Sequence, residues 1–325
     1  MKSSCCEILL EKPAIILHGS PSEAAGVAFR GALILDVKKV TKIKSIQLRL
    51  EGRAQIIRES GHSDGTNKII LDDTLTLIEP NSTYSLAVGK NAFEFEYRFP
   101  GHLPETVVTQ FGQITYRLKA TIERPHILCD IRIQKPVLVK RFLRSVGADI
   151  HDESLHITQV YKSAASVSIQ APKRNYTLGE VVPLHVKVLP LKEKVKVRRV
   201  AFRLVQNVSL GEENSKKTQQ WREISNQAVS CSEFLFNVRL PKNDIFQPGC
   251  STKYIQTSHE VIVLVGFDIN GKIECGYITF NIEITHKRQE DESLPVYTPV
   301  EESVAPKLPS YKEITIDTYR TCLIR

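Results

Sequence analysis

Two tetrapeptides near the carboxyl end of this 325-residue chain have the composition of a docking motif. A WW domain binds a preformed polyproline segment in an aromatic groove, and a tyrosine at the end of that segment fills a neighbouring pocket. The two tetrapeptides are Leu294-Pro295-Val296-Tyr297 and Leu308-Pro309-Ser310-Tyr311. We therefore predict a WW-binding site in which Pro295 and Pro309 are the rings and Tyr297 and Tyr311 are the anchors.

The spacing of the two motifs supports this prediction. They start 14 residues apart, so a partner with several WW domains can hold both, and the second contact then becomes intramolecular. Prolines and tyrosines also recur in loops by chance, which is the alternative explanation.

A cluster of cations without an intervening acid lies near the end of the first half of the chain. Its members are Arg132, Lys135, Lys140, Arg141 and Arg144, and a second group contains Lys38, Lys39, Lys42 and Lys44. Such clusters can face nucleic acid, anionic lipid or acidic peptide. Nucleic-acid modules usually add stacking aromatic residues or a recognition helix, and the sequence shows neither. Acidic peptides and membrane surfaces are the favoured partners, and solvated strand faces are the alternative.

One pentapeptide matches the nucleophile elbow of hydrolases, Gly61-His62-Ser63-Asp64-Gly65. That motif works only where a strand leads in and a helix leads out, because the strained turn must expose the serine. Here a strand is expected before the motif, from Arg53 to Arg58, and another strand after it, from Lys68 to Leu71. We therefore predict a loop between strands, and no catalytic residue.

The cysteines favour neither a metal site nor a disulfide framework. There are seven of them, an odd number, and no two have the C-x-x-C spacing. The chain ends in Cys322-Leu323-Ile324-Arg325, which has the shape of a prenylation site, but arginine is not among the usual final residues. Cys5 and Cys6 are candidates for acylation or for small buried thiols. We predict no metal and no cofactor.

The net charge of +8 is unevenly distributed. Residues 289–325 contain seven acids and four bases, so residues 1–288 carry a net charge of +11. The sequence shows neither a signal-peptide pattern nor a run of about 20 apolar residues that could span a bilayer. These features predict a cytoplasmic protein with a basic body and an acidic tail.

The elements that must carry these residues are strands, and the same alternating strand pattern occurs once in each half of the chain. The segment from Lys42 to Leu50 alternates with Ile46, Leu48 and Leu50 on one face, and Lys196 to Leu204 repeats the pattern 154 residues later. A second pair of segments agrees with the first, since FEFEYRFP and FLFNVRLP lie 141 residues apart. The repeated order of the segments predicts two tandem copies of one β domain.

The remaining patterns also favour an all-β fold. Apolar and polar residues alternate from Ile114 to Ile122, as in a strand with one solvent-exposed face. The segment from Val261 to Val265 is apolar throughout and is expected to be covered on both faces. Frequent turn signals and the absence of a long capped helix pattern indicate antiparallel, immunoglobulin-type β-sandwiches. We predict a sandwich over residues 1–150, a linker over 151–165, a second sandwich over 166–288 and a disordered tail over 289–325.

Several ordered motifs resemble the fungal α-arrestins. In the first half they are Ala14-Ile15-Ile16-Leu17-His18-Gly19, Phe29-Arg30-Gly31, the segment from Lys44 to Gly52 and the segment from Tyr116 to Pro125. In the second half they are Tyr176-Thr177-Leu178-Gly179-Glu180, Trp221-Arg222 and Ser258-His259-Glu260-Val261. The resemblance covers roughly residues 7–312 and implies two tandem arrestin sandwiches.

The resemblance also implies a function. Such proteins are not enzymes; they are adaptors that recruit WW-domain HECT ubiquitin ligases to plasma-membrane transporters or receptors, which are then ubiquitinated and internalised. It implies that the cation cluster receives acidic or phosphorylated cargo tails, and that the protein is recruited from the cytoplasm to plasma membrane and endosomes, where it can touch anionic membrane. The family's usual docking motif has two prolines, and here Leu294 and Leu308 replace the first one. A structural sorting subunit of an endosomal coat, or a signalling scaffold of the same fold, is the alternative.

Overall fold

The computed structural model describes residues 5–57, 67–125, 129–142, 154–193, 195–211, 216–228, 233–242 and 246–286. Its contacts divide the chain into two units, Met1–Lys287 and Arg288–Arg325, and all the described residues belong to the first. This described part is built of strands and contains no helix, so no helix in it could cross a membrane. The predicted all-β fold is confirmed.

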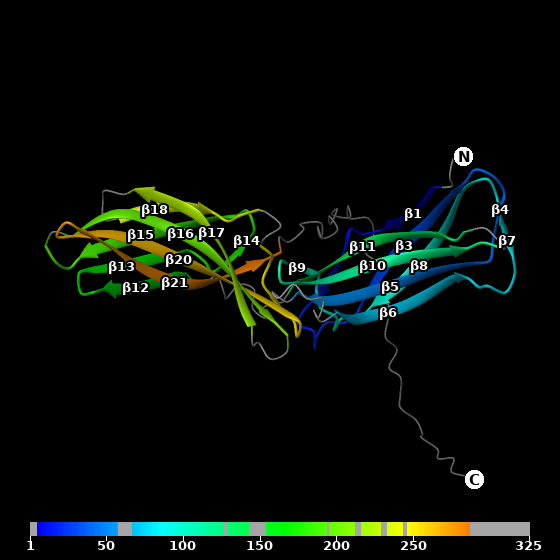
Figure 1. The fold of residues 1–325 in the computed structure, drawn as a ribbon, viewed down its shortest axis with the longest axis horizontal. Helices are drawn as coiled ribbons and strands as arrows, with labels where there is room; N and C mark the ends of the chain where they lie inside the picture. The colour runs from blue at the N-terminus through cyan, green and yellow to red at the C-terminus, as the bar shows by residue number, and fades with distance from the viewer. Residues whose placement is uncertain are drawn as a thin grey trace, which may run out of the picture. The chain divides into compact units, whose positions relative to one another are not determined.

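The N-terminal sandwich packs two sheets face to face (Figure 1). The smaller sheet has the order β1 (Cys5–Leu10), β3 (Val27–Val37) and β8 (Gly89–Phe99). The larger sheet has the order β2 (Ala14–His18), β11 (Ile131–Phe142), β10 (Gly112–Glu123), β5 (Ser45–Ile56) and β6 (Asn67–Ile78). A short strand, β9 (Val107–Thr109), pairs with β10, and β4 (Thr41–Ile43) forms a separate pair with β7 (Tyr84–Leu86).

The C-terminal sandwich repeats this plan. One sheet has the order β12 (Leu155–Tyr161), β13 (Ala165–Ala171), β15 (Val181–Pro190) and β18 (Glu233–Arg239). The other has the order β14 (Asn175–Thr177), β21 (Lys272–Thr285), β20 (Ile255–Ile269), β16 (Val195–Leu210) and β17 (Lys216–Ala228), with β19 (Cys250–Ser251) paired to β20.

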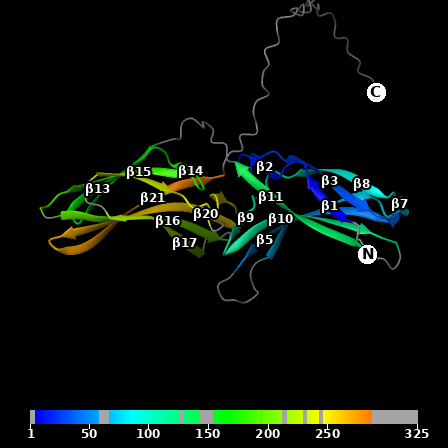
Figure 2. The same ribbon diagram turned by 90° about the horizontal axis from the view of Figure 1, so that it is seen from above.

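The two larger sheets match strand for strand, as the repeated sequence pattern predicts. In each, a short early strand pairs in parallel with the last long strand, β2 with β11 and β14 with β21 (Figure 2). In each, two long central strands pair antiparallel, β5 with β10 and β16 with β20. The strands that carry the duplicated segments, β5 and β16, therefore occupy equivalent places.

Alternation along these strands places the apolar side chains in two cores. Ile46, Leu48 and Leu50 of β5 are at most 2% exposed, and Val200, Phe202 and Leu204 of β16 are fully buried. Burial of each such side chain contributes about 1.5–3 kcal/mol to stability before the entropy of ordering the chain is counted. The predicted inward faces are confirmed in both copies.

Close packing restricts one position of β5. The ring of Tyr116 on β10 lies against Gly52, and a Cβ atom at that glycine would come within 2.6 Å of the ring. Tyr116 is 1% exposed, packs edge-on against Phe99 and donates its hydroxyl proton to the carbonyl oxygen of Pro104 at 2.7 Å. Glycine is required at residue 52 because this aromatic ring passes directly over the backbone.

Three details of the predicted fold are wrong. Leu155–Tyr161 forms β12, an edge strand of the second sandwich, so the linker predicted over 151–165 does not extend through these residues. The segment Lys42–Leu50 is not one strand, because β4 pairs with β7 and β5 starts only at Ser45. The Val261–Val265 segment of β20 is fully buried on one face only, since Ile262 and Leu264 are half-buried.

Candidate functional site

The strand β11 divides the predicted cation cluster between two faces. Successive side chains of a strand point to opposite sides of the sheet. Lys135 and Arg141 therefore share the face of Val137 and Val139, which are buried in the core, whereas Arg132 and Lys140 lie on the opposite face. Arg144 lies outside the described residues. The cluster is not one continuous surface.

Arg141 is a structural residue, which corrects its assignment to cargo binding. It is 8% exposed, and its guanidinium donates to three backbone carbonyl oxygens, those of Gly19 at 2.8 Å and of Gly101 and Leu103 at 2.7 Å each. Its Nε lies 3.5 Å from a carboxylate oxygen of the buried Glu105. A guanidinium held in this way has no accessible donors for an incoming acidic segment.

The other described members of the cluster differ in accessibility. Lys135 is half-buried and donates from Nζ to the carbonyl oxygen of Ile8 at 2.8 Å, which links β11 to β1. Lys140 is half-buried. Arg132 has a side chain that is 75% exposed, and it pairs with Asp130 at 3.1 Å. Arg132 is therefore the most accessible described cation of the predicted set.

The outward face of the larger N-terminal sheet gathers further cations that the linear sequence does not bring together. Cross-strand neighbours place Thr121 of β10 beside Arg132, Lys119 beside Arg49 of β5, and Arg117 beside Glu51. Arg117 is exposed and makes no ion pair with the residues that the structure describes. We name this surface the basic sheet face; its cations are Arg49, Arg53, Arg117, Lys119 and Arg132.

Two carboxylates are embedded in the basic sheet face. Glu51 is only 4% exposed and accepts hydrogen bonds from Arg53 Nε at 2.5 Å and Lys119 Nζ at 3.0 Å. The hydrogen bond from Arg53 is the largest cause that lowers the pKa of Glu51 to about 2, against the opposing effect of burial. Asp72 of β6 receives two hydrogen bonds of 2.6 Å from Arg49. With Asp130, which pairs with Arg132, three carboxylates oppose the five cations, so the face stays basic, with Arg117 at its centre.

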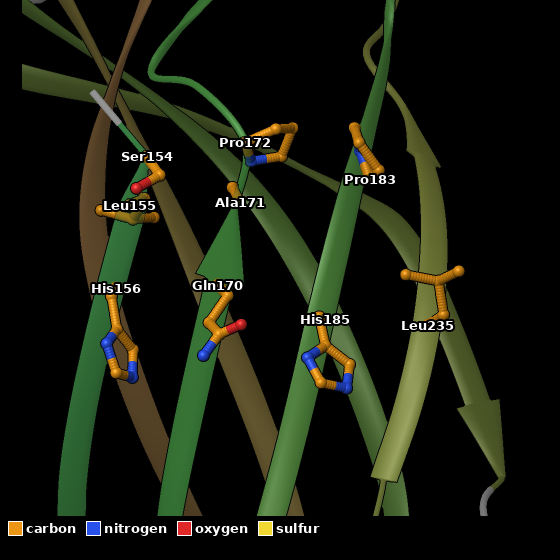
Figure 3. Close-up of a pocket in the computed structure, with 9 residues that line it drawn as sticks. All are labelled: Ser154, Leu155, His156, Gln170, Ala171, Pro172, Pro183, His185 and Leu235. Carbon is orange, nitrogen blue, oxygen red and sulfur yellow. The ribbon is translucent and has the colours of Figure 1, made fainter. Parts of the chain in front are cut away.

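A shallow groove of about 470 Å³ lies on the outer surface of the smaller C-terminal sheet (Figure 3). Register places His156, Gln170, His185 and Leu235 in one row across β12, β13, β15 and β18. Figure 3 shows these four side chains side by side on neighbouring strands. His185 Nε2 lies 2.8 Å from a carboxylate oxygen of Glu233, and His156 Nε2 lies 3.1 Å from the hydroxyl of Ser168. The groove is thus walled by histidine, glutamine, serine, proline, alanine and leucine side chains.

These side chains do not form a metal site. In the stretches of chain that the structure describes, no three histidine, cysteine, aspartate or glutamate side chains converge as a set of metal ligands would. Among the cysteines in those stretches, Cys250 is buried, Cys6 is half-buried, and Cys129 and Cys275 are exposed.

The remaining predicted residues lie outside the described residues. They include both tail motifs, with Leu294, Pro295, Tyr297, Leu308, Pro309 and Tyr311, and also Ser63 and Cys322. The elements on either side of Ser63 are β5 and β6, which pair antiparallel with Gln55 opposite Asn67. A strand therefore leads in and a strand leads out, which is the arrangement that we predicted and not that of a nucleophile elbow.

Comparison with known proteins gives consistent matches along the chain. Residues 23–144 match the family described as "Arrestin (or S-antigen), N-terminal domain", and residues 162–289 match "Arrestin (or S-antigen), C-terminal domain". A putative arrestin-related trafficking adapter of Schizosaccharomyces pombe is 24% identical over 331 residues, which cover 81% of this chain and 50% of that protein.

Two further relatives come from other organisms. "Arrestin domain-containing protein 17" of Caenorhabditis elegans is 30% identical over 221 residues, which cover 60% of this chain and 51% of the relative. The "HECT-type ubiquitin ligase-interacting protein apyA" of Emericella nidulans is 25% identical over 211 residues, which cover 61% of this chain and 56% of that protein. The chain spans about half the length of these three relatives, and 36% of an arrestin domain-containing protein of S. pombe.

Proposed function

Because this chain belongs to the arrestin family and carries its N-terminal and C-terminal domains in tandem, we propose that it is a non-enzymatic trafficking adaptor. It recruits a WW-domain HECT ubiquitin ligase to plasma-membrane transporters or receptors and thereby promotes their ubiquitination and endocytosis. The combination of two arrestin domains with two Leu-Pro-x-Tyr motifs behind them carries this proposal. The protein acts from the cytoplasm and is recruited to plasma membrane and endosomes.

The ligase arm of the proposal rests on the tail. Pro295 and Pro309 each precede a tyrosine by two residues, which suits a polyproline groove with an adjacent tyrosine pocket. One relative is named as a protein that interacts with a HECT-type ubiquitin ligase, and we extend that partner class to this chain. Two motifs allow a ligase with several WW domains to bind at both sites at once.

The cargo arm rests on the basic sheet face together with the remaining cations of the predicted cluster. Arg132 is the described residue that belongs to both sets, and Lys135, Lys140 and Arg144 complete the cargo-binding proposal. Arg117 is exposed beside Glu51, whose charge is already met by Arg53 and Lys119. An acidic or phosphorylated cargo tail supplies the anions that such a face lacks, through charge-assisted hydrogen bonds.

A pulldown with the tandem WW domains of a HECT ligase tests the ligase arm. The full chain with Tyr297→Ala and Tyr311→Ala together should lose retention, because both anchors are removed. Tyr319→Ala is the matched control, since this tyrosine lies in the same segment but has no proline two residues before it. Undiminished retention of the double variant would show that the docking assignment is wrong.

A further inference from the structure

The strand pair β4 and β7 brings two turns together at one end of the N-terminal sandwich, on the side away from β9 (Figures 1 and 2). One turn connects β3 to β4 and the other connects β7 to β8. Val37 pairs with Gly89 on one side of these turns, and Thr41 pairs with Leu86 on the other. The turns must therefore lie next to each other. We name residues 36–42 and 84–90 the β4–β7 tip.

Short hydrogen bonds hold both turns in shape. The hydroxyl of Thr41 donates to the carbonyl oxygen of Lys39 at 2.8 Å. The side-chain amide of Asn91 donates to the carbonyl oxygens of Ala87 at 3.0 Å and Gly89 at 3.1 Å. Gly89 has a φ of +111°, which only glycine adopts readily. The backbone of the tip is therefore held in a defined shape.

The tip exposes apolar side chains while it remains anchored to the core. Ile43 and Leu86 are 0% and 8% exposed and fix the strand pair to the sandwich. Val40 and Val88, one in each turn, are 67% and 61% exposed, and Tyr84 is 39% exposed. Exposed aliphatic side chains that gather at one place indicate an interaction surface, because single scattered ones need no explanation but a cluster does.

The same tip carries a net positive charge. Four exposed lysines and one half-buried aspartate give it +3, since Lys38 pairs with Asp36 and the others are unopposed. Lys39, Lys42 and Lys90 make no ion pair with any residue that the structure describes. Like charges that remain together without a carboxylate partner repel one another, and an anionic surface relieves that repulsion.

We propose that the β4–β7 tip docks onto the anionic surface of a lipid bilayer. Its lysines contact the phosphate and carboxylate groups of the lipids, and Val40 and Val88 enter the boundary between headgroups and acyl chains. Each lysine near an anionic leaflet adds attraction, and the exposed valines add burial of apolar surface. Long lysine stems keep the charges at headgroup level while the turns go deeper.

The composition of the tip favours a membrane over an acidic peptide. Residues 36–42 and 84–90 contain lysines but no arginine, and lysine is a point charge without the planar fork that grips a carboxylate or phosphate in a fixed geometry. An acidic peptide also offers no apolar layer for Val40 and Val88. A fluid anionic surface satisfies both features. This inference goes beyond the adaptor function and does not depend on the ligase-docking motifs.

Sedimentation of the full chain with vesicles tests the proposal. The vesicles contain phosphatidylcholine alone or phosphatidylcholine with phosphatidylserine. The unaltered protein should bind only the phosphatidylserine vesicles. Lys39→Glu, Lys42→Glu and Lys90→Glu together should weaken that binding at least about tenfold. The charge-matched control reverses Lys196, Lys242 and Lys272, three exposed lysines of the C-terminal sandwich, and should retain most of the binding.

The apolar part of the proposal has its own variants. Val40→Asp with Val88→Asp should weaken vesicle binding, whereas Val160→Asp, at a valine that is 55% exposed in the C-terminal sandwich, should not. The indole ring introduced by Val88→Trp should fluoresce, and brominated lipid in the vesicles should quench that fluorescence. An unchanged thermal midpoint in each variant excludes unfolding as the cause.

Three outcomes would overturn the proposal. In the first, the tip variants and the control variants bind vesicles equally well. In the second, the unaltered protein binds both kinds of vesicle equally well. In the third, the tip variants lose binding to a phosphorylated peptide but keep binding to vesicles. Retention of the tip variants on tandem WW domains separates this result from the ligase proposal. If the unaltered chain is not retained on tandem WW domains but still binds vesicles through the tip, only the adaptor function is refuted.

Discussion

The imidazole of His259 and the side-chain amide of Gln206 meet between the neighbouring strands β20 and β16, with His259 Nε2 3.1 Å from Gln206 Oε1. Both residues are buried, at 2% and 0% exposure. The same oxygen of Gln206 also accepts a hydrogen bond from the backbone N–H of Gln247 at 2.8 Å. Because an amide oxygen only accepts, the imidazole must donate from Nε2. Burial lowers the pKa of His259 to about 4, so the ring is neutral near pH 7.

This pair predicts a loss of stability in mild acid. The unfolded chain protonates His259 near pH 6.5, whereas the folded chain resists protonation until about pH 4. Stability is therefore fully present above pH 6.5 and falls as the pH is lowered toward 4, by an amount on the order of 3 kcal/mol. Burial also lowers the pKa of His286 to about 4, so that histidine acts in the same window.

Urea unfolding midpoints between pH 7 and pH 4.5 measure this effect. Compared with the unaltered chain, His259→Gln should show a flatter pH dependence, and His286→Gln supplies the contribution of the second histidine. Carboxylates such as Glu51, whose pKa is lowered to about 2, act mainly below this window. An equal slope in the unaltered chain and in both variants would contradict the assignment.

Because Arg141 is buried and Arg132 is exposed on the same strand, we expect their replacement by alanine to lower stability by very different amounts. Arg141→Ala leaves the carbonyl oxygens of Gly19, Gly101 and Leu103 without these donors and leaves Glu105 without its nearby cation. Removal of one partner from a buried charged arrangement costs about 3–5 kcal/mol. Arg132→Ala, at a side chain that is 75% exposed, should cost less than about 1 kcal/mol. Chemical denaturation compares the two, and similar midpoints would show that Arg141 is not structural.

The basic sheet face predicts opposite effects from two neighbouring residues. Arg117→Glu should weaken binding of an acidic cargo-tail peptide several-fold, because it reverses the exposed cation at the centre of the face. Glu51→Gln should strengthen the same binding, because Arg53 and Lys119 lose the carboxylate that they contact. Fluorescence anisotropy at two salt concentrations measures both, and the differences should shrink at high salt. If both variants change the affinity in the same direction, the face is not the peptide site.

The two tail motifs predict a gain from simultaneous binding. Tyr297→Ala or Tyr311→Ala alone should reduce affinity for a tandem WW protein by about 10-fold or more, since linked contacts add up to about 10²–10⁴ in affinity. Either single variant should bind an isolated WW domain nearly as well as the unaltered chain does. Calorimetry with the tandem and the single domain checks this, and equal losses for both ligands would mean that only one motif binds.

The faces of individual strands could be predicted from the sequence because their period is local. Val200, Phe202 and Leu204 alternate, and all three are buried. The same parity was available for the cation cluster, since Arg141 is nine residues from Arg132 and an odd spacing on a strand places two side chains on opposite faces. Only the assignment of Arg141 changes, because the members of the cluster share a charge but not a face of β11.

Other features depend on register and could not be derived from the sequence. Strand register sets Arg117 beside Glu51, although the two residues lie far apart in the chain. Register also brings together the turns that contain Val40 and Val88. Strand β12 was missed for another reason. It is an edge strand with only Leu155 fully buried, and its apolar alternation breaks at Gln159-Val160.

The parallel pairs that close the two large sheets constrain the order in which the chain can fold. Ala14 of β2 pairs with Leu138 of β11, and Asn175 of β14 pairs with Glu283 of β21, separations of 124 and 108 residues. On the ribosome, each early strand must wait without its partner until nearly the whole domain has been synthesised. Contacts of such long range slow folding, and the first sandwich can close before the second has been translated. The nascent chain thus completes its two halves one after the other.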